Sequence, residues 1–266
     1  MQSKSLLQEY LSFIQVSKSK RTYDTYSSIL QDFPTLTPQS LINKMAEWKN
    51  SNLSSNTIVL RLTVVRTYLN WLNSNSKCNV EDIPEMIAIT RSVKLQQKIQ
   101  EYATEEVTKA TIAALKKSSH KAIVGLMYYS ALRVSEAIGL TVDCLKDDGF
   151  IVKDPKNKCD RYIPYLSKEL NKLLDDHIQR TRPTNKLFPD VTQNAFQRTL
   201  KRALENIGCP KLHAHSFRHG MVTKFLEKDI DVATIASITG HKSLSSLQRY
   251  FHVSNTMLEK TKDVFK

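Results

Sequence analysis

The sequence predicts a mainly α-helical protein with a small β-sheet, organised as a helical N-terminal domain followed by a larger C-terminal domain. Apolar residues recur at helical spacing along most of the chain, and only 6 of its 266 residues are glycine. The stretch GFIVKDPKNKCDRYIPY differs, because β-branched runs flank a polar turn, a pattern typical of a β-hairpin. A chain of this length has room for one or two domains.

The N-terminal part predicts amphipathic helices separated by polar turns. Three are short and read SLLQEYLSFI, RTYDTYSSIL and LINKMAEW, and a longer one reads SSNTIVLRLTVVRTYLNWL. Ser54 or Ser55 is the expected N-cap of the long helix, because a serine hydroxyl can accept a hydrogen bond from a free helical N–H. The predicted buried stripe of this helix consists of Leu60, Val64, Tyr68 and Leu72.

The helical pattern fades across SNSKCNVEDIPEMI, which is polar and contains Pro84. The second helical region starts at ATEE, where Thr104 is a cap-like residue, and continues to about Leu140. After the hairpin, helices resume at Ser167 and continue through a C-terminal tail helix. The predicted division is a helical domain over residues 1–76, a linker over 77–102 and a second domain over 103–266.

Charge indicates the class of partner. The chain carries 39 Lys and Arg against 26 Asp and Glu, a formal net charge of +13. Residues 1–100 hold 12 basic and 7 acidic side chains, and residues 101–266 hold 27 and 19, so both halves are basic. Such a field favours a nucleic-acid partner, and a merely soluble basic protein is the alternative. Arg61 and Arg66 lie off the predicted stripe, where they can contact DNA phosphates or form a solvated face.

Two other classes of protein are disfavoured. No apolar run is long enough to cross a membrane, and MQSKSLLQEYLSF lacks the features of a signal peptide, so neither a membrane span nor secretion is expected. The cysteines are scattered without a C-x-x-C pair, which favours a reducing compartment and disfavours a cysteine zinc site. They are Cys78, Cys144, Cys159 and Cys209.

The stretch KLHAHSFRHG, residues 211–220, concentrates three histidines and an arginine. Zinc is one interpretation, because His215 and His219 are one helical turn apart. No acidic residue lies in the stretch, however, and Arg218 places a permanent positive charge between these histidines. A helix that begins near His215 would also direct free N–H groups to the same place. The local chemistry therefore favours a phosphate over a metal ion.

Four further motifs are ambiguous when each is taken alone. Arg133, with Glu136 one helical turn later in YYSALRVSEAIGL, can be an ordinary surface ion pair. Lys156 can belong to a solvated, lysine-rich turn. His241 in ITGHKSL can cap a turn, and Tyr250 in SLQRYFHVS can be a packed aromatic residue.

Taken in order, these motifs resemble the tyrosine recombinases of the phage integrase family. The resemblance covers the C-terminal domain from about Thr104 onward, and the helical N-terminal part is similar to the family's core-binding domain. The family's catalytic lysine stands five residues before an Arg-x-x-Pro, and counting back from Arg161 and Pro164 selects Lys156. The resemblance implies these catalytic residues: Arg133, Glu136, Lys156, His215, Arg218, His241 and Tyr250.

The sequence departs from the family pattern at a few positions. Ala131 replaces the usual glycine before Leu-Arg, and Asn157 stands where a glycine often follows the lysine. Phe217 and Thr239 replace common leucines. None of these departures removes a functional group. The short stretch before the first helix leaves little room for the arm-site DNA-binding domain of many phage integrases, so none is expected.

The resemblance implies DNA strand cleavage by transesterification. Tyr250 would attack a backbone phosphorus, leaving a 3′-phosphotyrosyl enzyme and a free 5′-hydroxyl. Because charge grows on the non-bridging oxygens in the transition state, Arg133 and Arg218 would hold those oxygens. His241 would donate a further hydrogen bond to them.

Other residues would move protons or orient neighbours. Lys156 would protonate the leaving 5′-oxygen, and His215 would assist proton transfer near the tyrosine. Glu136 would orient its neighbours and offset the cluster of cations. His219 is expected to be structural, and the role of His213 is open. No cofactor or metal is expected, because covalent catalysis conserves the phosphodiester energy.

The resemblance also implies partners. They are double-stranded DNA at specific sites, three further subunits in a homotetramer on two paired sites, and an accessory DNA-bending protein. The expected location of the protein is the cytoplasm, in association with the nucleoid. The tail VSNTMLEKTKDVFK offers Val253, Met257 and Val264 for exchange with a neighbouring subunit, or for packing on its own domain. The expected function is site-specific recombination that integrates or excises a mobile element. A type IB topoisomerase, an inactive DNA-binding relative and a metal-dependent nuclease are the alternatives.

Overall fold

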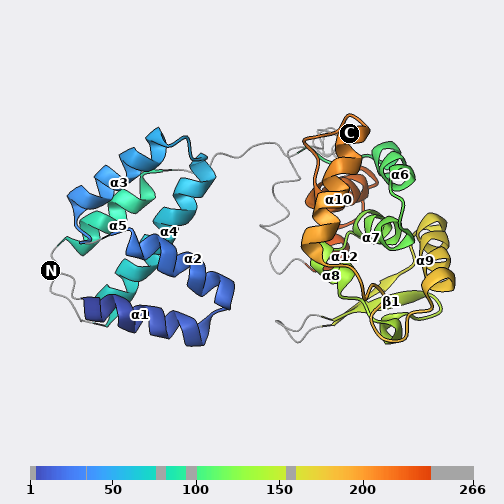
Figure 1. The fold of residues 1–266 in the computed structure, drawn as a ribbon, viewed down its shortest axis with the longest axis horizontal. Coiled ribbons are helices and arrows are strands. Elements are labelled where there is room, and N and C mark those ends of the chain that lie inside the picture. Colours follow the sequence, from blue (N-terminus) through green and yellow to red (C-terminus); the bar gives the residue numbers. More distant parts are fainter. Residues whose placement is uncertain (1–3, 34, 76–81, 94–100, 154–159, 241–266) are drawn as a thin grey trace, which may run out of the picture. The chain divides into compact units, whose positions relative to one another are not determined.

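The structure, a computed structural model, describes residues 4–33, 35–75, 82–93, 101–153 and 160–240. The chain divides into two compact units, Met1–Ile99 and Gln100–Lys266, and each contains its own hydrophobic core. Helices dominate both units, and the described residues form one two-stranded sheet, which confirms the predicted fold class (Figure 1). Within these ranges, no helix is long and apolar enough to cross a membrane.

The N-terminal unit is built around its longest helix, α4, which packs against α2, α3 and α5. Ser54 caps α4 by accepting a hydrogen bond from the backbone N–H of Thr57 at 3.2 Å. Ser54 rather than Ser55 is therefore the cap. The helices of this unit are α1 (Lys4–Ser17), α2 (Lys20–Gln31), α3 (Pro38–Asn50), α4 (Ser55–Ser74) and α5 (Ile83–Arg91).

The buried face of α4 differs at one end from the predicted stripe. Val64, Tyr68 and Leu72 are buried as predicted. Leu60 is 54% exposed, so the prediction that it is buried was wrong. Steps of four residues rotate by about 40° each around a helix of 3.6 residues per turn, so a stripe of three such steps drifts away from one face. The residues that α4 buries are Ile58, Leu62, Val64, Val65, Tyr68, Leu69 and Leu72.

A helix also lies where the sequence predicted only a linker, 77–102. Helix α5 places Ile83 and Met86 in the core of the N-terminal unit, with exposed fractions of 2% and 1%. Pro84 lies in the first turn of α5, where its missing N–H would have no helical partner in any case. The proline therefore begins this helix rather than interrupting one.

The C-terminal unit surrounds helix α7, which packs against α6, α9 and α11 (Figure 1). Every residue of α7 from Ala122 to Tyr129 is buried. The helices are α6 (Glu105–Ala114), α7 (Ser118–Tyr129), α8 (Val134–Ile138), α9 (Lys168–Thr181), α10 (Gln193–Asn206), α11 (Ala214–Glu227) and α12 (Val232–Thr239). A short 3-10 turn, Val142–Cys144, follows α8.

The sheet of this unit is the predicted antiparallel hairpin. Strand β1 (Gly149–Val152) pairs with β2 (Arg161–Pro164), with Gly149 opposite Pro164 and Val152 opposite Arg161. Phe150 and Ile163 are fully buried, so one face of the hairpin packs on the core. Strand β2 also contacts α12, which brings Arg161 close to the C-terminal end of that helix.

Close backbone packing fixes the start of α11. The N–H of Ala103 donates a hydrogen bond to the carbonyl oxygen of Ser216 at 2.9 Å. A Cβ atom on Gly220 would lie 1.9 Å from the Ala103 carbonyl oxygen, so only glycine permits this approach. These contacts set the position of the helix that carries His215 and Arg218.

Candidate active site

A sharp turn after α7 presents Arg133. Helix α7 ends at Tyr129, and Ala131 adopts a left-handed backbone conformation with φ of 51°. Arg133 is the N-cap of α8, and the carboxylate of Glu136 accepts a hydrogen bond from its backbone N–H at 2.8 Å. The same carboxylate accepts a second bond, at 2.8 Å, from the Arg133 guanidinium. The R-x-x-E spacing thus makes Glu136 both a helix cap and an ion-pair partner.

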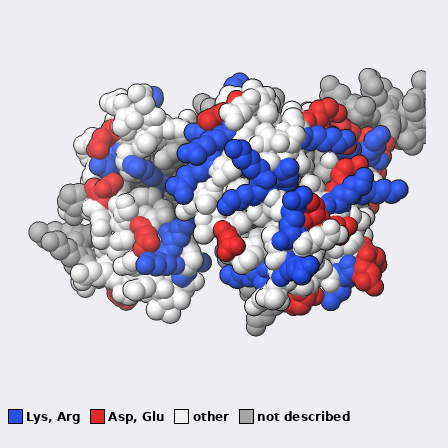
Figure 2. All heavy atoms as spheres, turned by 45° about the vertical axis from the view of Figure 1, so that its right-hand side comes forward, with Lys and Arg blue, Asp and Glu red and all other residues white. Residues whose placement is uncertain are grey.

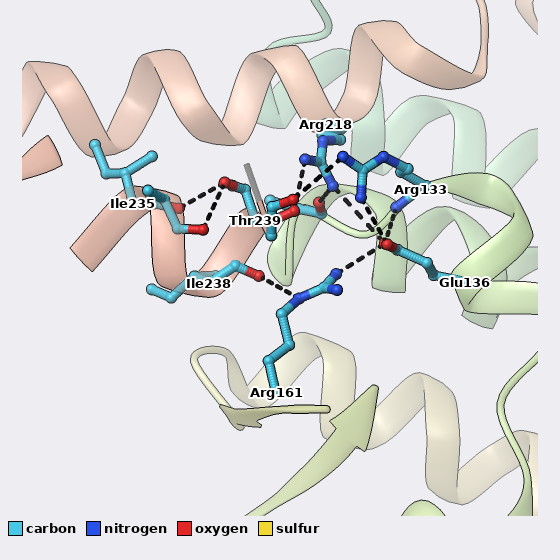
Figure 3. Close-up of polar contacts among 10 residues, drawn as sticks. Arg133, Glu136, Arg161, Arg218, Ile235, Ile238 and Thr239 are labelled. Atoms are coloured by element: carbon cyan, nitrogen blue, oxygen red, sulfur yellow. Dashed lines mark hydrogen bonds and ion pairs between the residues drawn. The ribbon is translucent and has the colours of Figure 1, made fainter. Parts of the chain in front are cut away.

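Arg218 extends from α11 into the same place and is almost completely buried. Its guanidinium donates hydrogen bonds to the carbonyl oxygens of Ala131 and Thr239, both at 2.7 Å. One of its terminal nitrogens lies 3.8 Å from a carboxylate oxygen of Glu136. Arg133 and Arg218, which are 85 residues apart in the sequence, therefore converge on Glu136 (Figure 3).

A third arginine, Arg161, completes the cluster. From β2, its Nη2 donates to Glu136 at 2.8 Å and its Nε donates to the carbonyl oxygen of Ile238 at 2.9 Å. In the sequence, Arg161 served only to identify Lys156 as the catalytic lysine. Arg161 itself was not predicted to be part of the site. The Arg-x-x-Pro motif was the available signal, because it marks a strand that begins five residues after the predicted lysine in the sequence.

The C-terminal end of α12 binds all three arginines. The carbonyl oxygen of Ile238 accepts from Arg161, that of Thr239 from Arg218, and that of Gly240 from Arg133 at 3.4 Å (Figure 3). The last carbonyls of a helix have no partners within the helix, and they carry the negative end of its dipole. Helix α12 is therefore a frame of acceptors that holds three guanidinium groups.

The electrostatics of this cluster favour an anion. Glu136 is one carboxylate facing three guanidinium groups, which leaves an excess of positive charge. Burial raises the pKa of Glu136, but the hydrogen bond and charge of Arg161, followed by the backbone and side-chain hydrogen bonds of Arg133, outweigh burial and hold this pKa below its usual range. Glu136 is thus ionised at neutral pH. Arg133 is the most exposed of the three arginines, with 38% of its side chain accessible.

His215 and His213 lie at the first turn of α11. His213 is its N-cap, and Nδ1 of His213 is hydrogen bonded to the hydroxyl of Ser216 at 3.0 Å. His215 lies at the surface, but partial burial and then the positive charges of His213, Arg218 and Arg133 lower its pKa. The imidazole of His215 is therefore mostly neutral at pH 7 and able to accept a proton.

The sequence departures fit this arrangement. Ala131 takes a positive φ, a conformation that glycine adopts without strain. Phe217 is fully buried in the main core, and the hydroxyl of Thr239 bonds back to the Ile235 carbonyl oxygen at 2.6 Å. None of these residues displaces an arginine.

Three predicted catalytic residues lie outside the described residues. They are Lys156, His241 and Tyr250. In sequence, Lys156 falls between β1 and β2, and His241 directly follows Gly240. Their roles stay predictions.

Across the part of the chain that the structure describes, no group of three or more His, Cys, Asp or Glu side chains has an arrangement that could hold a metal ion.

The predicted DNA contacts Arg61 and Arg66 both lie on α4 and are half-buried. The guanidinium of Arg61 lies over the ring of Trp48, 5.1 Å from its centroid, a cation–π geometry. Arg66 donates a hydrogen bond to the hydroxyl of Thr63 at 3.3 Å. Arg61 thus packs on an aromatic face rather than standing free in solvent.

Comparison with known proteins defines the class. The model of the phage integrase family matches residues 97–257, more than half of the chain. The chain therefore belongs to the phage integrase family and is a tyrosine recombinase, an enzyme that cleaves and rejoins DNA. It is 28% identical over 236 residues to tyrosine recombinase XerC of Rickettsia bellii, covering 81% of this chain and 75% of that protein.

Solved structures share the fold. The Tn1549 transposon integrase in complex with transposon right end DNA superposes with a TM-score of 0.77 at 15% identity, covering 98% of this chain and 99% of that one. A lambda integrase tetramer bound to a Holliday junction superposes with a TM-score of 0.71 at 15% identity, covering 90% of this chain and 74% of that one. At such identities the likeness is one of fold.

Proposed function

We propose that this tyrosine recombinase acts at specific DNA sites to integrate or excise a mobile element, and that Tyr250 is its nucleophile. The observation that carries the proposal is the convergence of Arg133 and Arg218 beside a single carboxylate, Glu136. Two fixed guanidinium groups can hold the two non-bridging oxygens of a phosphodiester as charge grows on them. The likeness to a transposon integrase supports the role in a mobile element.

Two residues would transfer protons, and a third would stabilise the developing charge. His215, whose pKa is lowered, accepts the proton of the tyrosine hydroxyl as Tyr250 attacks phosphorus. The P–O5′ bond breaks, and Lys156 gives its proton to the departing 5′-oxygen. His241 donates a hydrogen bond to a non-bridging oxygen. Rejoining reverses these steps, with a 5′-hydroxyl attacking the phosphotyrosine.

DNA binding is assigned to the basic surface. In the view of Figure 2, Lys and Arg side chains cover more of the displayed face than Asp and Glu do. Helix α10 buries Phe196 and Leu200 and exposes Arg198, Lys201 and Arg202 on its other side. These three cations, with Arg61 and Arg66 of the N-terminal unit, are suited to bind phosphates.

Assembly follows from the same proposal. The N-terminal unit, including α5, and the C-terminal unit would bind the duplex as a clamp, and four subunits would pair two sites. The tetrameric lambda integrase supports this assembly. Exchange of the C-terminal tail would link neighbouring subunits, an accessory DNA-bending protein would shape the complex, and the enzyme would act at the nucleoid. Mass photometry on DNA with one or two sites measures the assembly: only paired sites should give the mass of four subunits.

A suicide substrate tests the proposed chemistry. Wild-type protein should form a covalent adduct that peptide mapping places at Tyr250, with EDTA present throughout. Tyr250→Phe should bind the site normally and form no adduct, because it lacks only the attacking oxygen. An adduct on Tyr128, Tyr129, Tyr162 or Tyr165, or one that requires an added metal, would refute the mechanism.

The same preparation separates the alternatives. Relaxation of supercoils without site preference would favour a type IB topoisomerase. Site binding without any adduct in the wild-type protein would favour a catalytically inactive relative. Activity lost in EDTA and restored by a divalent metal would favour a nuclease.

A further inference from the structure

Arg161 differs from the other two arginines of the cluster in where its hydrogen bonds go. Both Nη2 and Nε are bonded to protein, to Glu136 at 2.8 Å and to the carbonyl oxygen of Ile238 at 2.9 Å. Its side chain is 12% exposed, compared with 38% for Arg133. Arg218 is buried as well, with 5% of its side chain exposed, but its short hydrogen bonds go to the backbone carbonyl oxygens of Ala131 and Thr239. Arg161 instead bonds the carboxylate of Glu136 directly, so it is suited to hold that side chain in place.

The two acceptors of Arg161 belong to separate parts of the site. Glu136 lies on α8, where it also binds Arg133, and Ile238 lies in the last turn of α12. The next two carbonyls of α12 accept from Arg218 and Arg133. Arg133 is the N-cap of the helix that carries Glu136, and Arg218 approaches Glu136 only to 3.8 Å. Within the described cluster, Arg161 is therefore the residue from another element that bonds Glu136 at 2.8 Å and also bonds the end of α12.

Gly240 leaves room for this bridge. It ends α12 in a left-handed conformation with φ of 68°. A Cβ atom on Gly240 would lie 2.9 Å from Nη1 and 3.1 Å from Cζ of Arg161. Both the conformation and the space therefore favour glycine here, and its absence of a side chain lets the guanidinium pass under the end of the helix.

We propose that Arg161 is a positioning residue for strand cleavage: it bridges Glu136 to the C-terminal end of α12 and so fixes the directions of Arg133 and Arg218. The inference rests on the proposed function, because it assumes that these two arginines hold the scissile phosphate. Arg161 also begins the strand that follows the segment containing Lys156, and the residue after Gly240 is His241. The side chain of Arg161 therefore connects strand β2 with helices α8 and α12. Four predicted catalytic residues lie on these elements or near them in the sequence: Arg133, Glu136, Lys156 and His241.

Rates of single-turnover cleavage on a suicide substrate test the proposal. Arg161→Gln should cleave about 10- to 100-fold more slowly, the range found when partners that orient metal ligands are removed. DNA affinity should match that of Arg180→Gln, which removes one arginine from an exposed ion pair with Asp176 on α9. Arg180→Gln should cleave at the wild-type rate. Equal rates for Arg161→Gln and Arg180→Gln would overturn the proposal.

A conservative variant tests the bridge and covers the case in which Arg161→Gln fails to fold. Arg161→Lys retains the positive charge beside Glu136, but an ammonium on a flexible stem does not reproduce the planar two-point contact. It should cleave more slowly than wild type and faster than Arg161→Gln. A wild-type rate for Arg161→Lys would show that charge alone suffices and would refute the bridge.

A double-mutant cycle with Glu136→Gln separates positioning from a general structural effect. If Arg161 acts through Glu136, the combined slowing in the double variant should fall short of the product of the two single effects. Multiplicative effects would contradict the proposal.

The pH profile provides a second readout. The charged groups around Glu136 are Arg133 from α8, Arg161 from β2 and Arg218 from α11. Loss of Arg161 should move the acidic limb of cleavage toward higher pH. His215 is a second titrating group of the site. The charges that lower its pKa belong to His213, Arg218 and Arg133, so its limb should stay in place. An unchanged profile in Arg161→Gln would contradict the proposal.

The control reactions distinguish the two levels of inference. Wild type and Tyr250→Phe run beside each variant. No adduct in the wild type would overturn the proposed function, whereas a normal adduct in wild type with full activity in Arg161→Gln would overturn only the role of Arg161.

Discussion

The two units hold their arginines in different ways. In the C-terminal unit, Arg218 and Arg161 have side chains only 5% and 12% exposed, and backbone carbonyls and a carboxylate fix their orientation. In the N-terminal unit, Arg61 lies over the face of Trp48, and Arg66 contacts a threonine of its own helix. Several directional bonds fix where a guanidinium points, whereas an aromatic face mainly fixes where its charge lies.

This difference matches two demands of a DNA-cleaving enzyme. Stabilising a transition state requires donors that are already directed at developing charge, because reorientation during the reaction would cost free energy. Attracting the duplex requires positive charge near phosphates, which tolerates several geometries. We therefore expect substitutions in the cluster to change cleavage rates, and substitutions on α4 to change affinity.

Among substitutions that leave Tyr250 in place, the largest effect is expected for the general acid. Lys156→Ala should slow cleavage by about 10²- to 10⁴-fold, the usual contribution of a positioned acid. A substrate with a 5′-bridging sulfur should restore the rate, because a thiolate leaves without protonation. Lys153 is the matched control, since its ammonium is 2.8 Å from a carboxylate oxygen of Asp143. Rescue of Lys153→Ala instead of Lys156→Ala, measured in single-turnover assays, would reassign the acid.

Replacing a fixed arginine should have the next largest effect. Arg218→Lys should lower the cleavage rate by about 10²- to 10³-fold, as when one preorganised donor is removed from a reacting centre. Lysine cannot contact the carbonyl oxygens of Ala131 and Thr239 with a planar fork, so its charge would lose direction. Arg61→Lys, which keeps the charge over Trp48, should cleave at a rate close to wild type. Similar losses in both variants would break the comparison between the units.

Glu136 gives a smaller, pH-dependent effect on stability. Its pKa is lowered in the folded protein, so its stabilising contribution is present above the unfolded pKa of about 4.3 and is lost as pH falls through the folded value. Glu136→Gln should therefore be less stable than wild type at pH 7, and the difference in Tm should shrink toward pH 3. Calorimetry across this range measures it, and a constant difference would contradict the assignment.

The smallest effect on chemistry is expected on α4. Arg61→Ala and Arg66→Ala should each reduce the slope of log affinity against log salt by about 1, because each phosphate contact releases roughly one counterion. Cleavage of a DNA site at saturating enzyme should stay at the wild-type rate. Fluorescence anisotropy across a salt series gives the slopes, and unchanged slopes in both variants would remove these arginines from the DNA interface.

Much of the fold could be predicted from the sequence because its signals are local. Helical periodicity, the serine and threonine caps and the β-branched runs of the hairpin depend on neighbouring residues alone. The errors have local causes too. Leu60 lies on a stripe drawn at four-residue steps, and α5 was hidden by Pro84, which is compatible with a first helical turn.

The site residues also separate into those marked by local motifs and one that only long-range contacts reveal. Ordered motifs selected Arg133, Glu136, His215 and Arg218, and the structure brings Arg133, Glu136 and Arg218 into one cluster. Arg161 was missed as a site residue because nothing in its own neighbourhood shows that it meets Glu136, 25 residues away, or Ile238, 77 residues away. Such pairs form only when α8, β2 and α12 have packed.

By itself, the sequence determined the helical fold class, the strongly basic character and the motifs of the phage integrase family. These features follow from side-chain chemistry and short spacings, which the chain carries before it folds. Only the tertiary structure decided which oxygens hold the arginines. The free carbonyls at the end of α12 and the carboxylate of Glu136 bind three guanidinium groups because packing brings distant backbone and side-chain atoms within hydrogen-bonding distance.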